Sequence, residues 1–225
     1  MLFRSGGGGY VSYFDNAIDY AVDNGTVIFA ASGNDNANSI SYPSGYANCI
    51  SVGALSPCNE RKNISSCDGE NYWGSNYGNG LDFLSPGVRI HTTTASGGYT
   101  STFNGTSSAC PLAAGVAGLI LSVDPSLSPD AVRTIMQISA VDIGIDGYDV
   151  ETGHGRVNVF NALATIMGGP EVNLNTNSIT EELSSDQTSE QSITVSNSGQ
   201  MNLTIDVDSF GYYWKDESDE SVNYN

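Results

Sequence analysis

The residue of this sequence best suited to covalent chemistry is Ser107, which stands in the stretch GTSSACP at residues 105–111. A serine hydroxyl is a poor nucleophile near neutral pH unless a base lies within hydrogen-bonding reach and donors stabilise the oxyanion that forms. A long apolar run begins just after Ser107, and a proline is tolerated near a helix start, so the pattern predicts a helix that begins close to the serine. That end of a helix favours negative charge nearby. A serine that only caps a core helix would fit the same residues.

A base for this serine is harder to find, because the sequence has 2 histidines. His91 follows a Pro-Gly turn, and His154 stands in a glycine-rich stretch. Both positions are typical of surface or turn histidines, so we assign neither as the base. The cysteine and histidine spacings do not match a zinc site.

Composition excludes some kinds of partner. The chain has 225 residues with Lys+Arg 7 against Asp+Glu 25, which gives a formal net charge of −18. Nucleic-acid binding needs a basic surface, so we expect no nucleic-acid partner. We expect no membrane insertion, because we find no uninterrupted run of about 18 apolar residues. The first residues do not form a signal peptide, so for an exported protein we expect the signal upstream of Met1.

The cysteines indicate an oxidising compartment. Cys58 and Cys67 bracket a polar segment, and a disulfide between them is favoured over two free loop thiols. Cys49 and Cys110 stand in apolar surroundings and are predicted to be buried core residues.

Hydrophobic periodicity predicts an α/β fold in the first part of the chain. Apolar residues at helical spacing follow Ser12, the expected N-cap, and Gly25 is the expected stop. Residues 27–31 are then continuously apolar, which favours a strand of a parallel sheet with helices on both faces. Further strands are predicted at 49–54 and 81–84, and further helices at 107–123, from 129 and at 157–167.

The composition changes near residues 168–170, GGP, and we predict three segments. Residues 1–168 form the α/β part, 169–171 a linker, and 172–225 a truncated β-rich, sandwich-like domain. In the last segment, apolar and polar residues alternate around a turn at 197–199, which predicts a β-hairpin.

Two stretches together resemble one known family. GTSSACPLAAG at 105–115 resembles the serine motif of the subtilisin-like serine proteases (subtilases), in which the serine after Gly-Thr is the nucleophile. VIFAASGN at 27–34 is similar to the family's strand and loop that end in the oxyanion-hole asparagine. The resemblance therefore implies that Asn34 and the Ser107 backbone N–H stabilise the tetrahedral intermediate. LDFLSPGV at 81–88 and GHGRVN at 153–158 resemble further family blocks in the same order.

The substrate-binding residues are also implied by the resemblance. Ser5-Gly6-Gly7 resembles the family's substrate-binding strand, along which an extended peptide would bind as an added strand. Ala31-Ser32-Gly33 would line the primary specificity pocket with it. Gly6 departs from the larger residue that is common in the family.

The resemblance covers residues 5–168 and implies the C-terminal half of a catalytic domain. The family's order is Asp, His, Ser, but no histidine precedes Asn34 and no His-Gly-Thr block occurs. We therefore expect a fragment of a secreted or cell-surface serine endopeptidase that acts on proteins or peptides. This fragment lacks the catalytic Asp and His and is expected to be inactive alone.

Two alternatives remain for the function. The chain could be a catalytically dead subtilase-like binding module. An α/β hydrolase is disfavoured, because its Gly-x-Ser-x-Gly pattern is not met around Ser107. We identify no cofactor, and calcium is suggested by the family resemblance alone.

Overall fold

The computed structural model describes residues 1–3, 6–169, 172–174, 192 and 194–199. The chain divides into two compact units, Met1–Gly169 and Pro170–Asn225.

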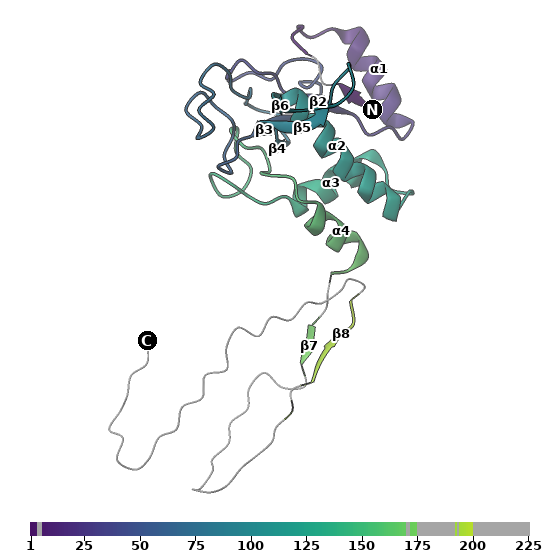
Figure 1. Ribbon diagram of the computed structural model, residues 1–225. Helices are drawn as coiled ribbons and strands as arrows, with labels where there is room; N and C mark the ends of the chain where they lie inside the picture. The colour runs from purple at the N-terminus through teal and green to yellow at the C-terminus, as the bar shows by residue number, and fades with distance from the viewer. Residues whose placement is uncertain (4–5, 170–171, 175–191, 193, 200–225) are drawn as a thin grey trace, which may run out of the picture. The chain divides into compact units, whose positions relative to one another are not determined.

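The first unit is built on a parallel four-stranded sheet with the order β1-β2-β3-β4 (Figure 1). The strands are β1 (Leu2–Phe3), β2 (Phe29–Ala31), β3 (Ile50–Leu55) and β4 (Phe83–Pro86). Three of them, β2, β3 and β4, overlap the strands predicted at 27–31, 49–54 and 81–84, and the predicted α/β fold is confirmed. The register opposes Phe29 to Ile50 and Val52 to Phe83.

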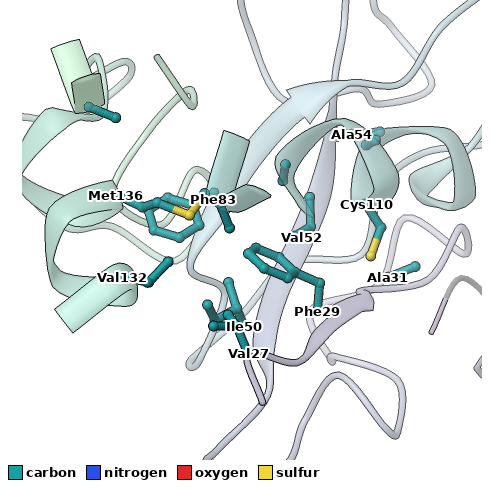
Figure 2. Packing of buried hydrophobic residues seen from close by; sticks show 14 of the residues in the cluster. Val27, Phe29, Ala31, Ile50, Val52, Ala54, Phe83, Cys110, Val132 and Met136 are labelled. Carbon is teal, nitrogen blue, oxygen red and sulfur yellow. The ribbon is translucent and has the colours of Figure 1, made fainter. Parts of the chain in front are cut away.

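Both faces of this sheet are covered, which explains why every residue of β2 and β3 is buried. Phe29 and Ala31 pack with β3, β4 and the helix that follows Gly105, as Figure 2 shows for part of this cluster. Ala30 points the other way and packs with Ile18 of the first helix. Successive residues of β2 therefore serve two different cores.

The first helix, α1, spans Ser12–Asp23, and Figure 1 shows it on the opposite side of the sheet from the later helices. The prediction that Ser12 is the N-cap is wrong, because Val11 holds that position and no side chain caps the helix. Tyr46 fixes the entry instead: its hydroxyl accepts from the Val11 N–H and donates to the Val11 carbonyl, each at 3.0 Å. Gly25, with φ +84°, follows the last turn as predicted.

Three helices cover the other face: α2 (Thr106–Val123), α3 (Pro129–Ser139) and α4 (Val159–Met167). Ser128 caps α3, because its Oγ accepts from the Ala131 N–H at 3.2 Å. Figure 2 shows Val132 and Met136 of α3 next to Phe83 of the sheet.

Helix α2 is strongly apolar, as the run of apolar residues after Ser107 predicts. Its 18 residues have a mean hydropathy of 1.6, enough to cross a membrane by length and composition alone. In the structure Ala109, Ala113 and Ile120 are buried in the cluster between α2 and the sheet. These residues make α2 a central core helix of the first unit.

Two antiparallel pairs complete the described strands. β5 (Ile90–Thr93) and β6 (Tyr99–Phe103) form a hairpin that leads into α2 and that we did not predict. In the second unit, β7 (Val172–Leu174) pairs with β8 (Val195–Asn197). Most of the predicted hairpin around residues 197–199 lies outside the described residues.

The connection between β3 and β4 contains a loop cross-linked by a disulfide between Cys58 and Cys67, with a Cα–Cα distance of 6.3 Å. Next to it, the fully buried Lys62 ammonium lies 3.2 Å from Asp68 Oδ1 and donates to the carbonyl oxygens of Asn63 and Glu70, each at 2.7 Å. The ammonium thus connects Asn63, Asp68 and Glu70.

Candidate active site

Ser107 is partly buried in the first turn of α2, where helical N–H groups point out of the end of the helix. Gly105 is the N-cap, with φ +108°. The Gly105 N–H donates to the Gly87 carbonyl at 2.9 Å, and Ser108 Oγ donates to the same oxygen at 3.2 Å. Because Gly87 follows β4 directly, the carboxyl end of that strand fixes the start of α2.

Asn34 lies against this turn. Its Oδ1 accepts from the Thr106 N–H at 2.8 Å and from Thr106 Oγ1 at 3.1 Å. Thr106 Oγ1 also accepts from the Gly33 N–H at 3.3 Å. With Oδ1 held by Thr106, the planar amide presents its Nδ2 donor on the opposite side.

The close approach of these two segments requires glycine at the N-cap. A Cβ on Gly105 would lie 3.3 Å from Asn34 Oδ1 and 3.4 Å from Nδ2. The Asn34 amide therefore rests on the backbone of Gly105, the residue that precedes Thr106. An exposed amide donor and a helix N-terminus that meet in this way can bind an oxyanion formed next to Ser107.

The loop that carries Asn34 runs parallel to residues 74–77. The Asn36 N–H donates to the Gly74 carbonyl at 2.9 Å, and the Tyr77 N–H donates to the Ala37 carbonyl at 3.0 Å. Asn76, only 2% exposed, lies at the centre of this pairing. Sequence reasoning missed it, because no motif we recognised includes it.

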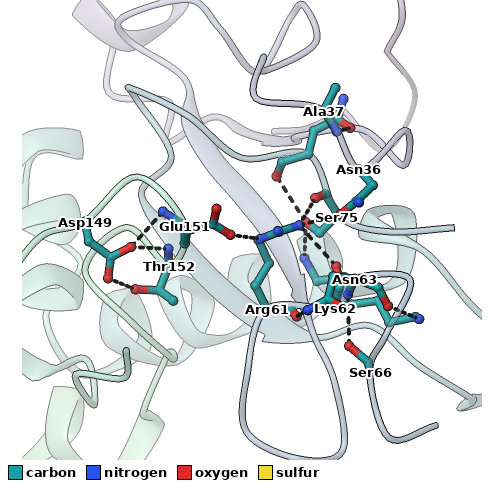
Figure 3. Close-up of polar contacts among 12 residues, drawn as sticks. Asn36, Ala37, Arg61, Lys62, Asn63, Ser66, Ser75, Asp149, Glu151 and Thr152 are labelled. Atoms are coloured by element: carbon teal, nitrogen blue, oxygen red, sulfur yellow. Dashed lines mark hydrogen bonds and ion pairs between the residues drawn. The ribbon is translucent and has the colours of Figure 1, made fainter. Parts of the chain in front are cut away.

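A second buried side chain supports the same loop from the other side (Figure 3). Arg61 Nη1 donates to Asn36 Oδ1 at 2.9 Å and to the Ser75 carbonyl at 2.7 Å, while its Nε is paired with Glu151. The guanidinium also stacks on the Tyr77 ring, 4.1 Å from the centroid. This arginine links the Asn34 loop to the late turn at residues 149–152.

Two segments are predicted to bind substrate, and the first of them lies at an exposed edge. Gly6 and Gly7 are exposed and run beside Tyr42, whose carbonyl accepts from the Gly7 N–H at 3.2 Å. A Cβ on Gly6 would approach the Tyr42 carbonyl oxygen to 2.7 Å, which explains the glycine at this position. Ser5 lies outside the described residues.

The other arm of the predicted pocket is less accessible. Ala31 and Ser32 are buried, and Ser32 Oγ donates to the Asn76 carbonyl at 3.0 Å, so this hydroxyl points into the protein. Gly33 is half-buried and sits at φ +113°. Of these three residues, Gly33 is the one that reaches the surface next to Asn34.

Neither histidine is placed as a base. His91 lies on β5, where Nδ1 is 2.9 Å from Ser101 Oγ and the ring stacks on Tyr99. His154 contacts the rings of Phe83 and Tyr148. Among the described residues there is also no group of three or more His, Cys, Asp or Glu side chains that could hold a metal ion.

Comparison with known proteins bears on the family to which this chain belongs. The model of the Subtilase family matches residues 3–155. The chain belongs to the subtilase family. The matched segment spans β1 to the late turn and includes both Asn34 and Ser107.

Two subtilase relatives are considerably longer than the segment they share with this chain. Alkaline elastase YaB of Bacillus sp. (strain YaB) is 37% identical over 64% of this chain and 34% of its own length. Halolysin-like extracellular serine protease Nep of Natrialba magadii is 40% identical over 63% of this chain and 24% of its own length. The chain thus spans about a third or less of either protein.

A solved subtilase-like structure shows the same fold. The prenylagaramide maturation protease PagA superposes with a TM-score of 0.62 over 74% of this chain and 62% of its own, at 24% identity. At this identity the likeness bears on the fold alone.

Proposed function

We propose that this chain is the C-terminal part of the catalytic domain of a serine endopeptidase, with Ser107 as nucleophile and Asn34 as oxyanion donor. The observation that carries the proposal is the pair of hydrogen bonds from Thr106 to Asn34 Oδ1, at 2.8 and 3.1 Å. They bring the amide of a loop after β2 to the first turn of α2. A serine that only caps a core helix has no need of this contact.

The proposed reaction is acyl transfer. Ser107 Oγ attacks the carbonyl carbon of the scissile amide while a base removes the hydroxyl proton, and the carbonyl oxygen becomes an oxyanion that Asn34 Nδ2 and the Ser107 N–H stabilise. The amide C–N bond then breaks, the amine leaves with that proton, and water hydrolyses the acyl ester. In this proposal the histidine base and its aspartate partner lie outside residues 1–225.

The substrate would be a protein or peptide bound in extended form. Within the exposed segment from Gly6 to Gly8, Gly8 forms an antiparallel bridge to Tyr42. An extended peptide that pairs with this segment would add a strand and place its scissile bond near Ser107.

We also propose that the protein acts outside the cell. The disulfide between Cys58 and Cys67 suits an oxidising compartment, and the relative from Natrialba magadii is described as extracellular.

The test is fluorophosphonate labelling and peptide hydrolysis by the complete gene product. Ser107 is expected to carry the adduct, and Ser107→Ala is expected to abolish both labelling and turnover. Asn34→Ala is expected to lower kcat with KM little changed; for the oxyanion-hole asparagine of subtilisin itself the known loss is about 10²–10³-fold, and that magnitude is taken over here. Residues 1–225 alone are expected to remain unlabelled.

The alternative function is a catalytically dead binding module. A complete gene product that folds but forms no Ser107 adduct and hydrolyses no peptide would favour this alternative and contradict the proposal.

A further inference from the structure

Asn76 makes hydrogen bonds to the backbone on both sides of Asn34, with its side chain after Asn34 and with its own backbone before it. Its Oδ1 accepts from the Asp35 N–H at 2.8 Å and from the Ala37 N–H at 3.1 Å. Its backbone N–H donates to the Gly33 carbonyl at 2.9 Å. The residues before and after Asn34 are therefore both bonded to one buried asparagine.

The nitrogen of the Asn76 amide makes hydrogen bonds to residues that follow Asn34. Nδ2 lies 3.3 Å from Asp35 Oδ2 and 3.3 Å from Ser41 Oγ, and both can accept its protons. At 2% exposure, this amide has all its hydrogen-bonding groups engaged by the loop that carries Asn34.

Gly33 provides a steric match to this arrangement. A Cβ at that position would stand 2.3 Å from Asn76 Nδ2 and 2.6 Å from Ser41 Oγ. The loop therefore lies directly on the Asn76 amide, without space for a side chain between them. The Asn34 side chain points away from this contact, toward Thr106.

We infer that Asn76 is a positioning residue for the oxyanion hole, which holds the loop at residues 33–37 so that Asn34 stays bonded to Thr106 beside Ser107. The inference rests on the proposed function. Asn76 touches neither substrate nor the reacting atoms, and it acts through Asn34. An amide suits this role, because the loop presents two N–H donors on one side and two oxygen acceptors on the other.

The energetic reason lies in the sensitivity of catalysis to small displacements. An oxyanion donor acts only when it is preorganised within hydrogen-bonding distance of the developing charge. Removing the Asn76 amide releases the two backbone N–H groups of Asp35 and Ala37, directly after Asn34, so the loop can move by a fraction of an ångström or more. A misplacement of about 1 Å can cost about 10²-fold in rate.

The test is a double-mutant cycle in the complete gene product, with kcat, KM and the unfolding temperature measured for each variant. Asn76→Ala is expected to lower kcat by about 10- to 100-fold with KM changed less than about threefold. In an Asn34→Ala background the same substitution is expected to change kcat by less than about threefold, because the group it positions is gone. The drop in unfolding temperature should be the same in both backgrounds.

The matched control is Asn158→Ala, which removes the cap of α4, where Oδ1 accepts from the Asn161 N–H at 3.1 Å. This variant is expected to lower the unfolding temperature and leave kcat unchanged. Hydrogen exchange gives a readout independent of turnover: the Asp35 and Ala37 amides should exchange faster in Asn76→Ala and at the unsubstituted rate in Asn158→Ala.

If Asn76→Ala does not fold, Asn76→Asp replaces it in the cycle. This variant keeps an acceptor for the two N–H groups but places a carboxylate against Asp35. It is expected to lower kcat when Asn34 is present and to leave kcat unchanged when Asn34 is replaced by alanine. Equal losses of kcat with and without Asn34, or unchanged kcat, would overturn the role of Asn76. Absence of Ser107-dependent hydrolysis in the unsubstituted protein would instead overturn the proposed function and the role that rests on it.

Discussion

Two glycines allow Asn34 to reach the first turn of α2. Gly33 and Gly105 both have φ near +110°, at +113° and +108°, a region that side chains disfavour. Each also lies against a partner, Gly33 against Asn76 and Gly105 against the Asn34 amide. The site is therefore an assembly of close backbone contacts as well as of polar side chains.

Gly33→Ala should damage this assembly more than Gly25→Ala, which introduces a side chain at a positive-φ glycine with open space around it. The new Cβ would stand 2.3 Å from Asn76 Nδ2, so we expect a loss of about 1–3 kcal/mol in the free energy of unfolding from overpacking, in addition to backbone strain. Gly25→Ala is the matched control, because φ is +84° there and no atom lies within 4 Å of the new Cβ. Denaturant unfolding of residues 1–225 measures both, and equal losses would contradict the steric explanation.

Some of these residues could be assigned from sequence and others could not. Ser107 and Asn34 stand in contiguous motifs, so their types and neighbours suffice. The bond between Asn76 and the Asp35 N–H spans 41 residues and depends on how two loops run side by side. No local pattern encodes that pairing.

At the scale of elements, the loop between β3 and β4 is joined to the segment that precedes the nucleophile helix. Glu70 accepts from Asn104 Nδ2 at 2.7 Å and from Trp73 Nε1 at 2.9 Å. Asn104 in turn accepts from the Arg89 N–H at 2.6 Å. The cross-linked loop thus supports the approach to α2.

Removing the disulfide should destabilise the first unit by a moderate amount. The cross-link between Cys58 and Cys67 closes a short loop with a sequence separation of 9, so the chain-entropy relation gives about 2–3 kcal/mol. The measurement is denaturant unfolding of Cys58→Ser/Cys67→Ser against the oxidised protein. Both cysteines are exposed, so reduction of the unsubstituted protein should reproduce the loss. Unchanged stability in both experiments would show that the cross-link adds nothing to this loop.

Glu70 should make the stability of this junction depend on pH. Burial alone raises the pKa of its carboxyl, but hydrogen bonds from Trp73, Asn104 and Arg89 outweigh it, and the pKa is lowered below its ordinary value. A lowered pKa means that the ionised group stabilises the fold above the pKa of the unfolded chain, and that this contribution is lost as pH falls through the folded value. Thermal unfolding at acidic pH should show the loss.

Glu70→Gln is the control for this pH dependence, because it keeps oxygen and size but cannot ionise. The variant should be less stable than the unsubstituted protein near neutral pH and approach it in acid. A constant difference across the pH range would assign the effect to another group.

Element boundaries show where sequence patterns fall short. Apolar spacing located α1 and the glycine that ends it, but Ser12 is not its cap. The entry is set by Tyr46, distant in sequence, which bonds both main-chain groups of Val11. The capping rules describe local side chains, and here a tertiary contact takes their place.

At the scale of the molecule, the two free cysteines lie on opposite faces of the sheet. Cys49 packs in the cluster with α1, and Cys110 packs between α2 and the sheet. Both are buried as predicted, and burial raises the pKa of each thiol to about 12.

These thiols should report whether the core has opened. Near pH 8, a pKa of about 12 leaves only about 10⁻⁴ of each thiol as thiolate, and burial blocks access as well. Native residues 1–225 should take up no aromatic disulfide reagent, and the denatured, non-reduced chain should release two equivalents, from Cys49 and Cys110. Fast labelling of a natively folded sample would contradict the buried packing.

The bond between Asn34 and Thr106 also bears on how the protein folds, because it spans 72 residues. Contacts between such distant segments carry a large loop-closure entropy, and they form after more local structure has condensed. The strands β2, β3 and β4 must align before α2 can dock and bring its first turn to Asn34. We therefore expect Ser107 and Asn34 to come together late on the folding pathway, so that partly folded chains lack the proposed active site.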